Sequence, residues 1–265
     1  MTSENTPPTP PPETEYCSVN DIPLSEVPVP NYTEEEHGTW KILIEKQMSL
    51  LPGRACNEYL DGLKKVDFPM DRIPTLLEVS ANIEKHTGWR IIRVDGLVHP
   101  KEFFDLLARN IFPSTDFIRK RSEVDYTPEP DMFHDLFGHT PLLTNTEFTE
   151  FFEAFGKVGV NALEKYPEDH PVNQMLPRLY WYNVEFGLID EGNGPRAYGA
   201  GSVSSPNEIQ FCVSDKCKKH PFDVDVIAQK DYDIWHLQEE VFVIPSWEKL
   251  GKDFRGWAKS HGLWD

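Results

Sequence analysis

The chain has 265 residues, of which 39% are hydrophobic, and this length is enough for a single domain with a substantial core. It carries 26 basic against 44 acidic residues, and the net charge of −18 excludes nucleic acid and anionic membranes as natural partners. The sequence holds no apolar run long enough for a membrane span and no signal peptide, and its four cysteines have neither zinc-finger spacing nor a disulfide framework. We therefore expect a cytoplasmic protein.

The first 32 residues differ in composition from the rest of the chain. They are rich in Pro, Thr, Ser and Glu and include the run PPTPPP at 7–12. Such a segment cannot bury enough apolar surface to offset the entropy that it loses on ordering. We predict a disordered tail over 1–32 and one folded domain over 33–265.

Apolar residues recur at helical spacing from residue 33 to residue 88 and predict three helices. Pro52 and Gly53 end the first, Pro74 opens the third, and Gly88 ends it. The run WRIIRV at 89–94 is the first predicted strand, and Pro100 opens the helix that follows it.

Longer helices are predicted over 146–166 and about 172–189, and Ser246 caps a last one. The runs EIQFCV at 208–213 and EEVFVI at 239–244 predict strands. These elements indicate an α+β fold, a predominantly α-helical single domain with a few short strands.

His134 and His139 lie in the stretch YTPEPDMFHDLFGHTPLL at 126–143. On an ideal helix, residues five apart point about 140° away from each other, unlike the i, i+4 pair of a zinc-protease helix. Both rings can bind one metal ion only if the helix ends or distorts nearby, which Gly138 and Pro141 favour. The spacing alone is more often chance than ligation.

Glu185 is the acidic residue of the apolar and aromatic run LYWYNVEFG at 179–187. A buried carboxylate has to be paired, protonated or bound to metal. Two histidines and a carboxylate form the metal-binding triad of non-haem Fe(II) oxygenases. A salt bridge with Arg178 accounts for Glu185 equally well, and both interpretations remain open on this run alone.

Together with AYGAGSVSSPNEIQFC at 197–212, these two runs resemble the pterin-dependent aromatic amino acid hydroxylases, especially their short bacterial members. The resemblance extends from about Trp89 to Trp247. It implies an aromatic amino acid hydroxylase-like fold and a catalytic domain over 33–265 that binds iron and a pterin. Fe(II) would be held by His134, His139 and Glu185, and a tetrahydropterin would be the cosubstrate.

The same resemblance implies the cofactor-binding and substrate-binding residues. The pterin would lie against Gly96, Leu97 and Val98, stack on Phe103 and contact Asp135, where the family commonly has glutamate. On its own residues, Phe103 fits the core better than a pterin site. The substrate-binding residues would be Arg119 at the carboxylate, Thr127 beside it, Trp181 and Phe186 at the ring, and Ser204 near an iron-binding histidine.

The activity that the resemblance implies is hydroxylation of L-phenylalanine to L-tyrosine with O2. Val243 falls where the relatives that act on tyrosine have an acidic residue, so phenylalanine is favoured over tyrosine or tryptophan. A zinc hydrolase, a non-catalytic sensor of amino acids or pterins and a 2-oxoglutarate oxygenase are the less favoured alternatives. We expect a monomer that binds only small molecules.

Overall fold

The structure is a computed structural model, and it describes residues 16–125 and 130–265. The α-helices are α1 (Glu34–Leu50), α2 (Asn57–Val66), α3 (Leu76–Thr87), α4 (Pro100–Ala108), α5 (Thr146–Lys165), α6 (Pro171–Tyr180), α7 (Ala200–Ser204), α8 (Pro206–Cys212), α9 (Val224–Gln229) and α10 (Trp247–Ser260). The strands are β1 (Arg90–Arg93), β2 (Ile111–Ser114), β3 (Leu188–Asp190), β4 (Pro195–Ala197), β5 (Lys218–Pro221) and β6 (Glu240–Ile244). The predicted fold class, mostly helical with a few short strands, is confirmed.

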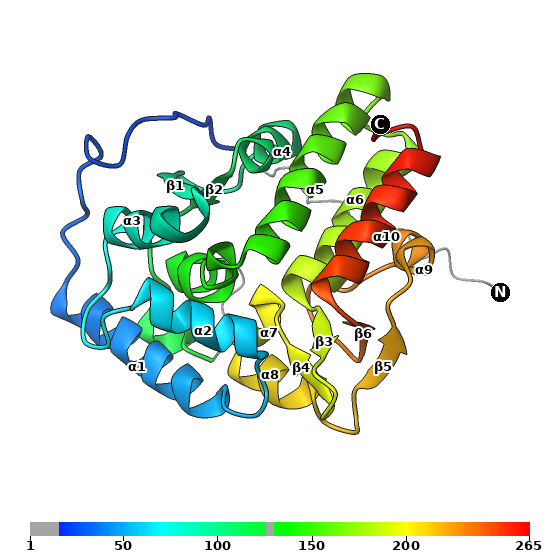
Figure 1. The fold of residues 1–265 in the computed structure, drawn as a ribbon. Helices are drawn as coiled ribbons and strands as arrows, with labels where there is room; N and C mark the ends of the chain where they lie inside the picture. The colour runs from blue at the N-terminus through cyan, green and yellow to red at the C-terminus, as the bar shows by residue number, and fades with distance from the viewer. Residues whose placement is uncertain (1–15, 126–129) are drawn as a thin grey trace.

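Helix α5 runs through the middle of the molecule, with α1, α2 and α3 to one side of it and α6 and α10 to the other (Figure 1). Its buried face is aromatic, because Phe148, Phe152 and Phe155 recur at helical spacing. Trp89 stacks on Phe152 with ring centroids 5.4 Å apart. This aromatic core is the rigid support on which the candidate site rests.

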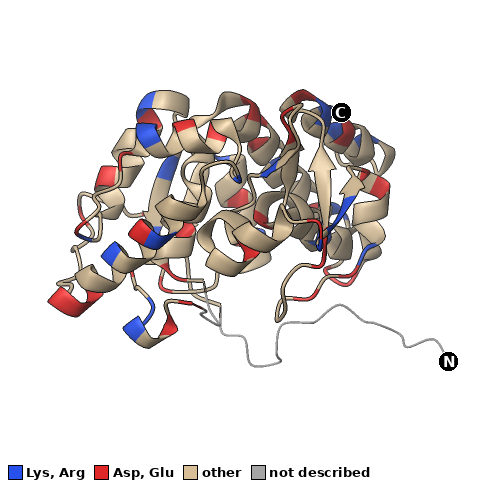
Figure 2. Cartoon of the chain, turned by 90° about the horizontal axis from the view of Figure 1, so that it is seen from below, with Lys and Arg blue, Asp and Glu red and all other residues tan. Residues whose placement is uncertain are grey.

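The strands form two small sheets. β1 and β2 are parallel and are joined through α4, and the other four strands are ordered β4-β3-β6-β5. In the larger sheet β6 lies parallel to β3, with Val243 opposite Leu188. Lys and Arg are interleaved with Asp and Glu over the visible face of the molecule (Figure 2). None of the described helices is both long and apolar enough to cross a bilayer.

Helix ends follow the predicted signals in most places. Thr75 caps α3 in a reciprocal pair with Glu78, and Gly88 ends that helix with a φ of 78°. Ser246 caps α10 by accepting a hydrogen bond from the backbone of Lys249. Pro74, however, precedes the capping residue of α3 rather than opening the first turn.

The strand predicted over 208–213 is wrong, because this segment is helix α8. Pro206 occupies its first turn, and Ser205 caps it by accepting from the amide of Glu208. These two start signals outweigh the β-branched and aromatic composition of the run. The helix predicted over 172–189 is also shorter, since its α-helical part ends at Tyr180 and β3 begins at Leu188.

The structure differs from the predicted disordered tail over residues 16–32, which lie against the domain. The amide of Cys17 donates to the carbonyl of Leu97 at 2.9 Å. Asp21 accepts from Arg90 at 2.8 Å and from Arg109 at 3.3 Å. These polar contacts hold a segment whose composition offers little apolar surface. The remainder of the predicted tail, 1–15, lies outside the described residues.

Candidate metal centre and adjoining binding site

Both segments that carry the candidate metal ligands are single π-helical turns. His134–His139 form one, and Trp181–Glu185 form the other at the end of α6. A π-helix has i→i+5 hydrogen bonds, so its wider turn brings residues five apart onto one face. This distortion removes the difficulty that an ideal helix poses for His134 and His139.

Gly138 lets the first π turn pack tightly on α7. A Cβ atom at this position would lie only 3.0 Å from the carbonyl oxygen of Ala200 and 3.1 Å from its Cβ. Any larger residue would therefore push the turn away from α7, which carries Ser204.

His134, His139 and Glu185 converge with their ligand atoms within 4.8 Å of one another. The two Nε2 atoms are 3.2 Å apart. Glu185 lies 3.3 Å from Nε2 of His139 and 3.6 Å from Nε2 of His134. Two imidazole nitrogens and one carboxylate oxygen at these distances can meet one divalent ion on a single face of its coordination sphere.

Hydrogen bonding fixes the tautomer of His134. The Ser204 hydroxyl donates to the carbonyl of Ala200 at 2.7 Å, so its oxygen is left to accept from Nδ1–H of His134 at 3.1 Å. The lone pair of the imidazole then lies on Nε2, facing Glu185. Burial lowers the pKa of His134 to about 4, which keeps the ring neutral. A neutral, oriented imidazole is what a metal ligand requires.

Glu185 is ionised despite its burial. Burial alone would raise the pKa of its carboxyl group, but the charge interactions with His139 and His134, which act when these rings are protonated, lower it to about 2. Arg178 pairs instead with Asp231, at 2.7 Å. The salt-bridge alternative for Glu185 is therefore wrong, and this donor set fits a divalent transition metal such as iron.

The predicted pterin-binding residues lie on the loop before α4 and on that helix. A Cβ at Gly96 would meet no atom within 4 Å, although the Cys17 thiol donates to the Gly96 carbonyl at 3.5 Å. Leu97 is exposed, and Val98 is buried. The ring of Phe103 packs edge-on against Tyr180 at 5.6 Å. The ring of Tyr180 in turn lies 6.5 Å from the ring of His139. Phe103 is thus connected to the metal-ligand triad through one intervening ring.

Asp135 points towards β2 rather than to the triad. Its Oδ2 accepts from the amide and the hydroxyl of Thr115, at 2.9 and 3.0 Å. Burial raises the pKa of this carboxyl group to about 6, against the lowering effect of these hydrogen bonds. Its second oxygen, Oδ1, accepts no hydrogen bond from the described residues, so it is the one that remains for a ligand.

Arg119 is buried and held in a fork by Asp131. Its Nε and Nη2 atoms donate to the two carboxylate oxygens at 2.9 and 2.7 Å. Asp131 also accepts from the backbone amide of His134 at 3.1 Å. One acidic residue therefore orients the predicted carboxylate-binding arginine and caps the turn of the first metal ligand. Thr127 lies outside the described residues.

Trp181 begins the second π turn and Phe186 directly follows it, and their ring centroids are 4.7 Å apart. The start of α7 packs on this turn, since a Cβ on Gly199 would lie 2.3 Å from the carbonyl oxygen of Glu185 and a Cβ on Gly201 would lie 2.6 Å from the Phe186 ring. The small residues of this segment allow the helix that carries Ser204 to pack against the turn that carries Glu185.

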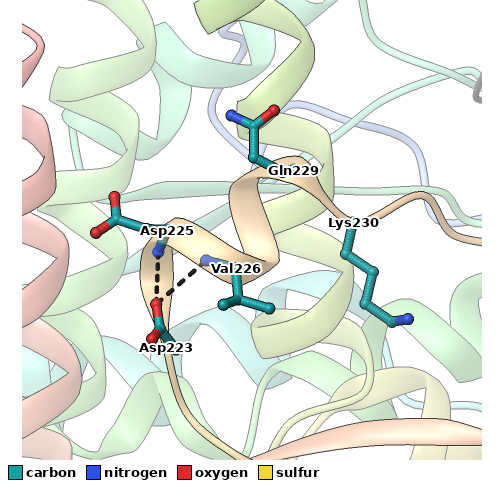
Figure 3. Close-up of a pocket in the computed structure, with 5 residues that line it drawn as sticks. All are labelled: Asp223, Asp225, Val226, Gln229 and Lys230. Carbon is teal, nitrogen blue, oxygen red and sulfur yellow. Dashed lines mark hydrogen bonds between the residues drawn. The ribbon is translucent and has the colours of Figure 1, made fainter.

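A surface hollow at α9 is not the site. It is formed at α9 by the residues labelled in Figure 3, where Asp223 caps the helix by accepting from the amides of Asp225 and Val226 at 3.0 and 3.1 Å. These side chains satisfy the start of a short helix. None of the predicted site residues within the described ranges lines it.

A comparison with known families places this site in a chemical context. A family model described as biopterin-dependent aromatic amino acid hydroxylase matches residues 20–262. The chain belongs to this family. The match extends beyond the resemblance drawn from the motifs, and it includes part of the segment before residue 33.

Several hydroxylases of the family are similar to the chain over most of its length. Phenylalanine-4-hydroxylase of Chromobacterium violaceum is 43% identical over 234 residues, which cover 87% of this chain and 76% of that protein. The Pseudomonas aeruginosa protein of the same name is 42% identical, with 83% and 82% covered. The crystal structure of the Chromobacterium violaceum protein with iron(III) and 7,8-dihydrobiopterin has a TM-score of 0.82 at 41% identity, covering 89% of this chain and 85% of that one.

Three residues that support the site were not identified from the sequence. Asp131 follows Pro130 and precedes His134 by three residues, which is a helix-capping signal that could have been read. Tyr180, beside Glu185, was placed on its helix without a role. Gln238, whose side chain accepts from the indole of Trp181 at 2.8 Å, has no sequence signal, because 57 residues separate the two.

Proposed function

We propose that this hydroxylase converts L-phenylalanine to L-tyrosine with O2 and a tetrahydropterin at a mononuclear Fe(II) site. The observation that carries the proposal is the convergence of His134, His139 and Glu185 in a chain of the biopterin-dependent family. Iron and the pterin, when bound, supply the activation and reduction of O2. One oxygen atom enters the amino acid ring, and the other leaves with the oxidised pterin.

The roles of the chain's own residues follow from their positions. His134, His139 and Glu185 hold the iron, and Ser204 keeps the His134 ring in the tautomer that presents Nε2. In this assignment Ser204 contacts the metal ligand His134 rather than the substrate. Two imidazoles and one carboxylate form a donor set that suits a ferrous ion.

The pterin is proposed to bind along Gly96, Leu97 and Val98 and to lie on the ring of Phe103. The exposure of Leu97 and the connection from Phe103 through Tyr180 to the metal ligands support this place. Asp135 is shorter than the glutamate that is common in the family, and Thr115 occupies one of its oxygens. A contact with the pterin would therefore use the other oxygen.

The amino acid is proposed to bind with its carboxylate at Arg119 and its ring at Trp181 and Phe186. The fork to Asp131 uses Nε and Nη2 of Arg119 and leaves Nη1, which donates to none of the described residues, for a ligand. Thr127 is retained as a neighbouring contact. Val243, half-buried on β6, presents no acceptor for a phenol, and an unpaired buried hydroxyl costs about 1–3 kcal/mol.

We also propose that residues 33–265 are the catalytic unit and that the protein acts in the cytoplasm as a monomer. Steady-state kinetics with Fe(II), a tetrahydropterin and each of the three aromatic amino acids tests the proposed substrate. The highest kcat/KM is expected for phenylalanine. A higher value for tyrosine or tryptophan would overturn the substrate while leaving the iron and pterin in place.

A further inference from the structure

Gln238 is a buried glutamine, 6% exposed, that lies two residues before the last strand of the larger sheet. Its side-chain oxygen accepts from the indole nitrogen of Trp181 at 2.8 Å. Its side-chain nitrogen donates to the carbonyls of Asp233 and His236 at 2.7 and 2.9 Å. The amide is therefore fixed in one orientation, with its acceptor towards Trp181.

The backbone of Gln238 is held as firmly as its side chain. Its amide donates to Oε1 of Glu208 on α8 at 3.1 Å, and its carbonyl accepts from the thiol of Cys217 at 3.5 Å. Rotating this residue away would break bonds to several separate segments. Both the side chain and the backbone of Gln238 are therefore held in one position by hydrogen bonds.

Trp181 is also held through its rings. Tyr232 stacks on it at 4.8 Å with planes 23° apart, and Phe186 contacts it at 4.7 Å. Ring contacts limit the tilt of an indole, but they do not choose the direction of its N–H edge. A half-buried indole N–H needs an acceptor, and among the described residues Gln238 provides it.

We propose that Gln238 is a positioning residue that fixes the ring wall of the amino acid site through the indole of Trp181. The inference rests on the proposed function for the place of Trp181 in that wall. Misplacing a reacting group by about 1 Å can cost on the order of 100-fold in rate. If the indole of Trp181 could rotate, the site would bind the aromatic ring of the substrate more weakly. It would also hold that ring less often in the position where oxygen is transferred.

The test uses the iron-loaded full chain and Gln238→Met, which keeps the length of the side chain and removes its polar atoms. Calorimetry is expected to show phenylalanine bound about tenfold more weakly. The tyrosine formed per pterin oxidised should fall to less than about half, while KM for the pterin stays within about twofold. Asn82→Leu, which loses a side-chain bond to Val66 between α2 and α3, is the control for a purely structural loss.

A second variant, Trp181→Phe, removes the same bond from the other side. If Gln238 acts through Trp181, adding Gln238→Met to Trp181→Phe causes no further loss of phenylalanine affinity. Additive losses would overturn the inference. It would also be overturned if Gln238→Met left both the phenylalanine affinity and the tyrosine formed per pterin oxidised unchanged. If Gln238→Met does not fold, Trp181→Phe is measured alone. Wild-type phenylalanine affinity and wild-type tyrosine formed per pterin oxidised in Trp181→Phe would then overturn the inference.

Nuclear magnetic resonance separates this inference from the proposed reaction. The indole N–H signal that disappears in Trp181→Phe belongs to Trp181, and in Gln238→Met it should shift and exchange faster with solvent. A signal unmoved by Gln238→Met would overturn the inference whatever the activity. A wild-type protein that makes no tyrosine would overturn the proposed function, whereas the inference would then be decided by amino acid affinity and this signal.

Discussion

The Nε2 atoms of His134 and His139 lie 3.2 Å apart because the turn between them is π-helical. On an ideal α-helix the two rings would point about 140° apart. The distortion therefore creates the metal-ligand pair, and Glu185 completes it from a second π turn. π turns inside α-helices are frequently found at functional sites.

His139→Ala should abolish iron binding without unfolding the protein. Removing one of three ligands from one face of the ion leaves too few donors, so iron content should fall from about one per chain to a small fraction, and turnover with it. Metal analysis of purified protein measures this. His170→Ala is the control, because His170 also stacks on an aromatic ring, Tyr166, outside the site. Iron retained by His139→Ala with full turnover would remove this residue from the ligand set.

Ser204→Ala should weaken iron binding while leaving the three ligands in place. The His134 ring would lose the acceptor of its Nδ1–H, and losing such a partner typically costs about 10–100-fold in metal affinity. Competition with a ferrous chelator measures the change. Ser202→Ala on the same helix is the matched control, since in the described structure its buried hydroxyl bonds to neither histidine. Equal affinities of the two variants would contradict the role of Ser204.

Arg119→Lys should raise KM for phenylalanine and leave KM for the pterin nearly unchanged. A lysine cannot make the two parallel bonds to Asp131 and still direct a donor at a substrate carboxylate. A charged hydrogen bond contributes about 1.5–3 kcal/mol, so kcat/KM for the amino acid should fall about 10–100-fold. Arg72→Lys disrupts a similar fork to Glu78 at the surface and should change neither constant. An unaltered KM in Arg119→Lys would place the substrate carboxylate elsewhere.

Glu208→Gln should stabilise the protein at alkaline pH. Burial raises the pKa of Glu208 from 4.5 to about 7, so the folded state binds this proton more tightly than the unfolded state does. Its stability contribution is therefore fully present below about pH 4.5 and is lost as the pH rises to 7. A neutral glutamine avoids this loss and keeps an acceptor for the amide of Gln238.

Urea unfolding of wild type and Glu208→Gln at pH 5 and pH 8 measures this effect. The advantage of the variant should be larger at pH 8 than at pH 5 by on the order of 2 kcal/mol. An advantage that is equal at the two pH values would show that Glu208 does not titrate in this range.

The sequence predicted the elements whose signals are local. Capping residues such as Ser246, and the recurring phenylalanines of α5, depend on neighbours within a few positions. EIQFCV was mistaken for a strand because its composition was weighed above the cap at Ser205 and the proline that follows it. The contacts of residues 16–32 were missed because they depend on Arg90 and Arg109, far along the chain.

The predicted site residues rested on motif resemblance, and the contacts between them depend on folding. No spacing rule links Trp181 to Gln238 or Asp135 to Thr115. A π turn is equally hard to predict, because its sequence is compatible with an ordinary α-helix and the packing of α7 on Gly138 accompanies the wider turn. The resemblance of the motifs thus indicated the ligands, while their orientation depends on tertiary contacts.

The most direct test of the proposed reaction is the fate of oxygen during turnover. The Fe(II)-loaded protein is incubated with phenylalanine, a tetrahydropterin and isotopically labelled O2, and the tyrosine is analysed by mass spectrometry. We predict tyrosine with one labelled oxygen atom in its ring hydroxyl, formed only when the pterin is present. Unlabelled product, or product formed under nitrogen or without the pterin, would contradict the proposed reaction.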